Sequence, residues 1–330
     1  MCLLCFSRSA APHSPWSSRR GFVLSAGALL VSPVVAQSPA PAPLMPNQIS
    51  ASAWYVEGQL ALGSSANQNF VSNAGFVITR DAVVVIDALG SPPLARQLLA
   101  AIRLLTDKPV SHVIVTHYHA DHIYGLQSFK AVGARVLAHQ AVREYLNSDT
   151  ARLRLEASRA ELAPWIDGDT QLIAADEWLI AGRTLEVGKV RFDILPVGPS
   201  HTPEDLVIYL PQEKVLFAGD LVFRNRIPFV GQADSRQWIK ALDALLAFDT
   251  SAIVPGHGPV STEARRDTEL TRDYLTYLRS VMGAAAKNLD SFDEAYQAAD
   301  WSRFQNLPLF RLANRMNAYN TYLLMEREAR

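Results

Sequence analysis

An α/β fold is the class that the sequence predicts, because short apolar runs of strand length alternate with segments of helical pattern. Residues 83–86 (Val-Val-Val-Ile) form a continuous apolar run, which is typical of a strand buried on both faces. A helix is predicted over 92–105, with Ser91 as its N-cap and two prolines in its first turn. A strand over 110–116 follows, and it completes a strand–helix–strand unit.

Similar patterns predict the elements on either side of this unit. Upstream, strands are expected to begin at 54–56 and at 70–71, the second continuing over 73–78. Downstream, a segment rich in Arg, Glu, Leu and Ala at 141–163 predicts an amphipathic helix that covers one entrance to the sheet. The later part of the domain is expected to contain strands at 190–195, 206–210 and 215–217, a helix at 235–248 and a strand at 252–254.

After residue 261 the composition is typical of helices, which are expected at 263–286, 291–299 and 307–328. Leu270, Tyr274, Leu278 and their neighbours recur at helical spacing, which indicates a face packed against the rest of the domain. We therefore expect one α/β domain over 49–260 and a C-terminal helical extension of it over 261–330.

Residues 117–122 (His-Tyr-His-Ala-Asp-His) are the most informative segment of the chain. They hold three of its eight histidines and one aspartate, directly after an apolar strand. Imidazole and carboxylate groups suit zinc, iron and manganese as ligands. His117 and His119 are expected to point to one side of an extended segment, while Asp121 and His122 begin the next helix and can face a second ion.

Three further candidate ligands lie in short loops that contain Gly. His201 ends Gly-Pro-Ser-His, His257 lies in Pro-Gly-His-Gly, and Asp220 follows the apolar Phe-Ala-Gly. Functional side chains are often carried by such loops, because a rigid sheet positions them. The remaining histidines lack this context, so structural or surface roles are expected for them.

Together these motifs resemble those of the metallo-β-lactamase superfamily. The resemblance covers roughly residues 50–260, and it implies a four-layered αβ/βα sandwich with a dinuclear metal site at one edge. By this resemblance, the first metal is bound by His117, His119 and His201, the second by Asp121, His122 and His257, and both by the bridging Asp220.

The resemblance implies two divalent ions. Zinc is expected first, although these ligands do not separate it from iron or manganese. A bound dication acidifies water to a pKa of about 7 and so supplies hydroxide as a nucleophile. Two ions about 3.5–4 Å apart need a bridging anion, which Asp220 supplies. From its position alone, Asp121 is a candidate to orient the attacking water or to accept its proton.

The first 48 residues have the composition of targeting and spacer sequence. A paired arginine at 19–20, an apolar stretch and small residues up to Ala36 form a twin-arginine signal pattern. We therefore expect 1–36 to engage the twin-arginine export machinery and to direct the protein to a bacterial periplasm. The stretch is shorter than the about 20 residues that span a bilayer, so no stable membrane anchor is expected after cleavage. The Pro/Ala-rich residues 37–48 predict an extended linker.

The amino-acid composition excludes several classes of function. Both cysteines lie in 1–36, so the predicted mature chain has no disulfide, and β-lactamase subclasses that use a cysteine ligand are excluded. Without 1–36, 28 basic residues remain against 32 acidic ones. A slightly acidic chain without a basic stripe is a poor candidate for nucleic-acid binding, so a small-molecule substrate is the expected partner.

Substrate contacts are expected directly after the bridging aspartate. Arg224 and Arg226 lie so close to Asp220 in the sequence that they could bind a carboxylate or another anionic group. A solvated surface pair fits the sequence equally well. Tyr118, between two candidate ligands, could hydrogen-bond near the site or pack in the core.

The branch within the superfamily is indicated by finer features. A bridging aspartate resembles the glyoxalase II-like and lactonase-like branches. The leader, the segment 222–229 and the tail near 314–319 are similar to periplasmic metallohydrolases encoded with sulfur-oxidation or quinoprotein systems. The primary expectation is an exported hydrolase that opens a small ester, thioester or lactone. A β-lactam-hydrolysing enzyme and a redox or metal-handling accessory protein on the same scaffold are the alternatives.

Overall fold

The structure is a computed structural model that describes residues 44–231 and 233–328. The predicted signal peptide at 1–36 and residues 37–43 of the predicted linker lie outside the described residues. The end of that linker is not a simple spacer, because Asn47–Gln48 forms a short strand that pairs antiparallel with the next one.

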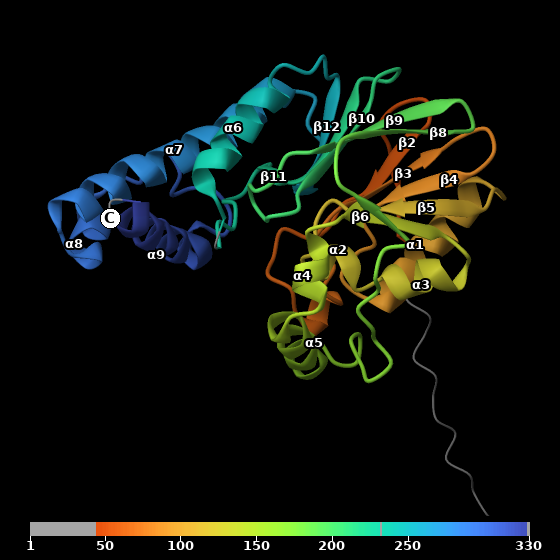
Figure 1. Ribbon diagram of the computed structural model, residues 1–330, viewed down its shortest axis with the longest axis horizontal. Coiled ribbons are helices and arrows are strands. Elements are labelled where there is room, and N and C mark those ends of the chain that lie inside the picture. The colour runs from red at the N-terminus through yellow and green to blue at the C-terminus, as the bar shows by residue number, and fades with distance from the viewer. Residues whose placement is uncertain (1–43, 232, 329–330) are drawn as a thin grey trace, which may run out of the picture. The chain divides into compact units, whose positions relative to one another are not determined.

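Two sheets organise the described chain (Figure 1). In the first, neighbouring strands follow chain order: β1 (Asn47–Gln48), β2 (Ala53–Val56), β3 (Ala74–Ile78), β4 (Val83–Ile86), β5 (Val110–Ile114), β6 (Arg135–His139) and β7 (Glu177–Leu179). In the second, the spatial order is β12 (Ala252–His257), β11 (Val215–Phe223), β10 (Leu206–Leu210), β9 (Val190–Pro196) and β8 (Arg183–Val187). The pairs β4–β5, β5–β6, β6–β7 and β11–β12 are parallel, and the others are antiparallel.

Helices connect the strands and cover both sheets. They are α1 (Pro92–Leu105), α2 (Ala120–Ile123), α3 (Leu126–Ala131), α4 (Val142–Leu146), α5 (Asp149–Glu161), α6 (Ser235–Leu245), α7 (Ala264–Asn288), α8 (Phe292–Ala298) and α9 (Phe310–Glu328), with a 3-10 turn at Ser65–Asn67. The predicted cap of α1 is confirmed, because the Ser91 side chain accepts a hydrogen bond from the Leu94 backbone N–H.

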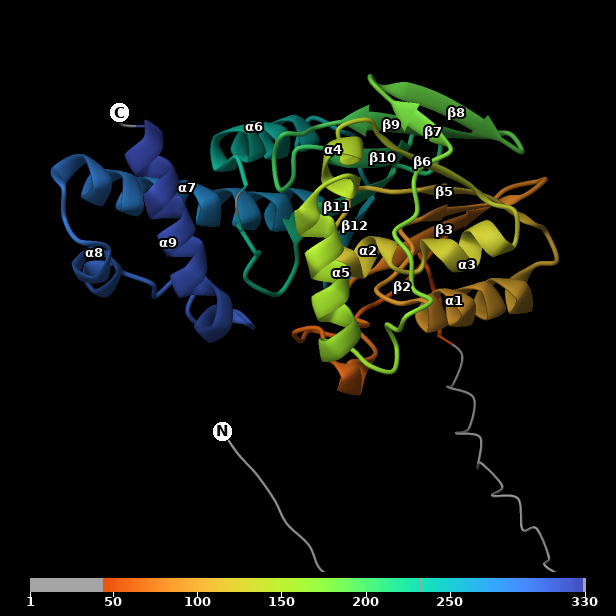
Figure 2. The ribbon, with the colours of Figure 1, turned by 60° about the horizontal axis from the view of Figure 1, so that its bottom comes forward.

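Three apolar cores separate four layers, as the sandwich prediction requires. Alternate residues of β4 show how one strand serves two cores: Val83 and Val85 pack with α1 and α3, while Val84 and Ile86 face the second sheet. The third core lies on the outer face of the second sheet, where α6 and α7 pack beside β11 (Figures 1 and 2). The four-layered αβ/βα architecture is therefore confirmed.

Three element predictions differ from the structure. The helix predicted over 141–163 is interrupted after α4, because Ser148 is extended and its side chain caps α5 through the Ala151 N–H. The strand predicted to end at 217 continues to Phe223. Residues 70–71 lie in a loop that follows the 3-10 turn, and not in a strand.

Of the C-terminal helices, α7 packs on β11 of the second sheet, and α8 and α9 pack on α7 and on one another. In Figure 2, α9 crosses α7 and α8 lies near the end of α7 that is farther from the sheets, and all three helices contribute to the outer core or its margin. Asn317 of α9 is fully buried and joins three segments: its amide donates to Pro228 O at 2.6 Å and to the Tyr274 hydroxyl at 3.0 Å, and its Oδ1 accepts from Val230 N at 2.9 Å. The tail thus fixes the loop after β11. Within the described residues, no helix combines the length and apolar character needed to cross a bilayer.

Asn317→Ala should lower the free energy of unfolding by about 1–3 kcal/mol, because it leaves a buried N–H and a buried carbonyl without partners. Urea unfolding measures this as a lower midpoint at an unchanged slope. The exposed Asn306 provides the control, since Asn306→Ala should leave the midpoint unaltered. Equal midpoints for the two variants would show that the tail does not stabilise this loop.

Candidate metal centre

The seven predicted ligands come together from segments that belong to both sheets. His117 and His119 lie in the segment between β5 and α2, and Asp121 and His122 lie on α2 itself. His201 lies in the loop between β9 and β10. Asp220 and His257 come from the parallel neighbours β11 and β12. The ligand atoms form two groups, His117, His119, His201 and Asp220 in one, and Asp121, His122 and His257 in the other.

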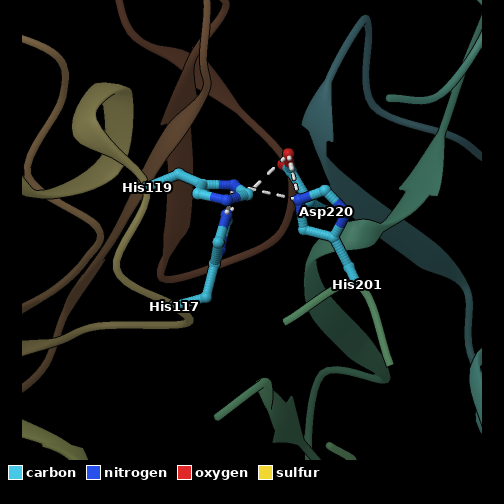
Figure 3. Close-up of side chains that lie close together, drawn as sticks. All are labelled: His117, His119, His201 and Asp220. Carbon is cyan, nitrogen blue, oxygen red and sulfur yellow. Dashed lines mark hydrogen bonds and ion pairs between the residues drawn. The ribbon is translucent and has the colours of Figure 1, made fainter. Parts of the chain in front are cut away.

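In the first group, four side chains point toward one another (Figure 3). The His119 Nδ1 lies 3.1 Å from the His117 Nε2 and 3.0 Å from the His201 Nε2. The Asp220 Oδ2 lies 3.3 Å from the His201 Nε2 and 3.8 Å from the His117 Nε2. These atoms surround one small space.

The second group shares Asp220 with the first. The His122 Nε2 lies 3.2 Å from the Asp220 Oδ1, and the His257 Nε2 lies 3.3 Å from its Oδ2. The Asp121 Oδ2 completes the group, at 3.4 Å from the His257 Nε2 and 3.7 Å from the His122 Nε2. The Asp220 carboxylate therefore lies between the two groups, where the family resemblance implies a bridging ligand.

These distances fit metal coordination. Ligand atoms held about 2.1 Å from a tetrahedral ion are about 3.4 Å apart, which is the spacing found in both groups. The His122 Nε2 and the Asp220 Oδ1 are buried and have no hydrogen-bond partner among the described residues. Such atoms are costly unless something binds them. The residues present thus fit divalent ions, while the identity of the metal is left open by this ligand set.

The charges of the site are consistent with this fit. Burial disfavours a charge on Asp220, yet His257 and His122 hold the pKa of its carboxyl well below the usual range. Burial also acts to lower the pKa of His122, but Asp121, Asp220 and Asp87 raise it well above its ordinary value. The carboxylates thus require positive charge beside them, which bound cations would supply in place of the proton.

Asp87, at the end of β4, is a functional residue that the sequence motifs did not reveal. It is buried, and its Oδ2 lies 2.9 Å from the His122 Nδ1. The same carboxylate accepts hydrogen bonds of 2.8 Å from the N–H and the hydroxyl of Thr116, and that hydroxyl lies 3.0 Å from the His117 Nδ1. Asp87 therefore orients one ligand of each group. Its only sequence signal was a carboxylate directly after a buried strand.

Asn73 is a second positioning residue that was missed. Its side-chain amide donates to Pro255 O at 2.8 Å and Gly258 O at 2.7 Å, on both sides of His257. The His257 Nδ1 in turn lies 2.7 Å from Val71 O, which fixes the ring. The segment before β3 thus holds the last ligand in place.

The ligand on β11 depends on an irregular backbone. The register between β11 and β12 shifts around Gly219, which has a φ of +50°. A Cβ at this position would lie 2.8 Å from the Thr116 hydroxyl, so glycine is required both for the conformation and for space. This bulge turns the next residue, Asp220, toward the histidines.

A cavity of about 340 Å³ opens onto the ligands. His119 and Asp121 reach it from α2 and the segment before it, and the Asp121 side chain is 20% exposed. The loop 61–71, helix α5 and the segment after β11 supply the other walls. Substrate therefore has access to both groups.

The structure places the three predicted substrate-contact residues in different environments. Arg226 lines the cavity. Arg224 does not, because its Nε pairs with the Asp267 Oδ2 at 2.7 Å and its guanidinium also donates to Val260 O. The Tyr118 hydroxyl donates to Ile173 O at 2.8 Å, and its ring lines an adjoining cavity instead.

Comparisons with known proteins agree with this site. The family model described as Metallo-beta-lactamase superfamily matches residues 68–257, which include all seven candidate ligands. The chain is 26% identical over 235 residues to a linear primary-alkylsulfatase from Pseudomonas sp., a match that covers 60% of this chain and 44% of that protein. It is 26% identical over 204 residues to Metallo-beta-lactamase type 2 from Bacillus cereus, covering 60% and 72% respectively. The chain thus spans less than half the length of the alkylsulfatase.

Solved structures show the same fold. A metallo-beta-lactamase from Pontibacter korlensis has a TM-score of 0.56 and 25% identity, covering 71% of this chain and 99% of that one. A stereoselective inverting sec-alkylsulfatase from Pseudomonas sp. has a TM-score of 0.66 and 20% identity, covering 85% and 50%. From the family match over more than half of its length, this chain belongs to the metallo-β-lactamase superfamily of metal-dependent hydrolases.

Proposed function

We propose that the protein is a dinuclear hydrolase that opens a small ester, thioester or lactone. The observation that carries this proposal is the position of Asp220, whose two oxygens lie within 3.3 Å of His122, His201 and His257. A carboxylate placed between two groups of imidazoles is suited to bridge two cations. Zinc is the metal we propose, with iron and manganese as the alternatives to be tested.

The residues of this chain have separate roles in such a reaction. When bound, two dications supply an acidified water and polarise the scissile carbonyl. Asp121 reaches the cavity with an exposed edge, so its carboxylate can accept the proton of the attacking water and return it to the leaving oxygen or sulfur. Burial acts to raise the pKa of the Asp121 carboxyl, but His122 and His257 lower it on balance.

Two further substrate classes are candidates because of the relatives. The Pseudomonas relative is named a linear primary-alkylsulfatase, and the Bacillus cereus relative a metallo-beta-lactamase. Sulfate esters and β-lactams are both opened by water, so the same ligand set is compatible with them. A panel of thioesters, lactones, alkyl sulfates and β-lactams therefore identifies the substrate class.

We also propose that the protein acts in the periplasm after twin-arginine export. The support is the arginine pair and the apolar stretch within residues 1–36. Replacing both Arg19 and Arg20 with lysine should keep the protein in the cytoplasm, as measured by cell fractionation.

The protein should contain close to two zinc ions per chain, and His119→Ala should reduce hydrolysis of the best panel substrate by more than about 100-fold. Metal analysis and steady-state rates measure both quantities. His112 lies outside the ligand groups, and His112→Ala serves as the matched control with normal activity. Two irons with no hydrolysis would favour redox or accessory chemistry, and a single metal would contradict the dinuclear assignment.

In excess zinc, which keeps both groups occupied although Asp121 is one of the candidate ligands, Asp121→Asn should lower kcat by about 100-fold or more, because the amide keeps the size of the side chain but cannot accept the proton. Measuring kcat and metal content on the same preparation separates proton transfer from metal loss. Normal turnover at full occupancy would exclude Asp121 as the base.

Asp87→Ala should weaken metal binding by about 10–100-fold, since His122 and Thr116 lose the carboxylate that orients them. Competition with a chelator measures this affinity. Asp81→Ala, at an exposed carboxylate paired with Arg80, is the control and should bind metal normally. Unchanged affinity for both variants would show that Asp87 does not support the ligands.

A further inference from the structure

Glu204 is a buried carboxylate that lacks a cationic partner. It lies in the loop between β9 and β10 and is only 6% exposed. Its Oε1 accepts a hydrogen bond of 3.3 Å from the backbone N–H of Tyr118, which is a neutral donor. Among the described residues, no Lys, Arg or His nitrogen lies within 4.0 Å of its oxygens. A buried charge is costly unless an opposite charge offsets it.

This carboxylate lines a second cavity of about 500 Å³, which adjoins the cavity described above. Both cavities share His119, His201 and Phe229, so the first ligand group lies between them. A substrate whose scissile bond meets this group therefore has room for one of its ends in the second cavity.

The two cavities differ in the charges that line them. Arg154 and Arg226 line the first cavity. Of the described residues that line the second, none is Lys or Arg, whereas Glu144 and Glu204 are both among them. Glu144 lies on α4 and is exposed, so it adds a solvated negative charge to the buried one. A cavity with charges of one sign attracts ligands of the opposite sign.

Aromatic side chains form another part of the wall of the second cavity. Tyr118, Tyr145 and Phe229 line it, and the centroids of the two tyrosine rings are 6.5 Å apart at an angle of 64°. Burial raises the pKa of both tyrosine hydroxyls, that of Tyr145 to about 12, and the charge of Glu204 adds to the effect on each. The carboxylate therefore lies near both tyrosines. Aromatic rings beside an anionic group are suited to bind quaternary ammonium ions.

We infer that the substrate carries an ammonium group that binds in the second cavity, beside Glu204 and the aromatic wall. The carboxylate supplies the opposite charge, and the ring faces attract a cation. Such a group also gives Glu204 the partner that the described residues do not provide. This inference rests on the proposed hydrolase function, because it names the class of substrate for the same site.

The variant Glu204→Gln separates this binding role from a structural one. The amide oxygen can still accept the hydrogen bond from the Tyr118 N–H, so the segment that carries His117 and His119 keeps its support. The negative charge is lost. A purely structural Glu204 would therefore be replaced without any change in ligand preference. Zinc content is measured on each preparation, so that a change in binding is not caused by metal loss.

Binding is tested on the zinc-loaded protein by calorimetry with choline and its neutral isostere, 3,3-dimethylbutan-1-ol. The wild type should bind choline at least about 10-fold more tightly than the alcohol, and Glu204→Gln should reduce this preference at least about 5-fold. Glu144→Gln should reduce it less, because an exposed charge is screened by solvent.

The matched control is Glu156→Gln, at an exposed carboxylate of α5 outside both cavities, which should keep the wild-type preference. Equal affinity of the wild type for choline and the alcohol would overturn the inference. An unchanged preference in a folded, zinc-loaded Glu204→Gln protein would overturn it as well.

Turnover separates this inference from the proposed function. The ratio of kcat/KM for acetylthiocholine to that for S-(3,3-dimethylbutyl) thioacetate should exceed about 10 in the wild type and fall at least about 5-fold in Glu204→Gln. If neither thioester is hydrolysed but choline binding still depends on Glu204, the hydrolase proposal fails while the cation site stands. If both thioesters are hydrolysed with equal kcat/KM, the function stands and the cation site is wrong.

Discussion

The contacts of Asp220 are the constraint on which the site depends. One carboxylate on β11 lies within 3.3 Å of imidazoles from α2, from the loop before β10 and from β12. These elements belong to both halves of the sandwich, so the two sheets must pack in register for the ligand atoms to meet. Gly219 provides the backbone turn that directs Asp220 toward the histidines. The geometry of the site therefore depends on this one irregularity as well as on the packing of the two sheets.

The ligands could be predicted because their signals are local. His117, His119, Asp121 and His122 lie within six residues after one apolar strand, and the other three each follow a glycine by one to three residues. The layers of the fold could be predicted equally well, since apolar runs such as 83–86 indicate strands that are buried on both faces. The supporting residues gave no such signal. Asp87 and Asn73 act through partners 29 to 185 positions away, and a lone Asp or Asn at a strand end is too common to indicate a role.

The two arginines show more clearly what could not be predicted from the sequence. Arg224 and Arg226 share a segment and a charge, and they follow Asp220 by four and six residues, so no pattern separates their roles. Their roles are set by what packs beside them, Asp267 of α7 for one and the rings of Phe223 and Phe229 for the other. The helix expected over 141–163 failed for a related reason: its composition is helical throughout, but Ser148 caps a new helix in its middle.

The C-terminal helices connect stability to specificity. Asn317 of α9 holds Pro228 and Val230, which flank Phe229, the ring that contacts Arg226 and lies between the two cavities. A change in α9 can therefore alter the cavity walls without touching a metal ligand. Since relatives in this superfamily carry names that differ in substrate, such supporting segments offer a route to new specificity. On this argument the tail supports the walls of the cavities through its contacts, although it supplies no ligand.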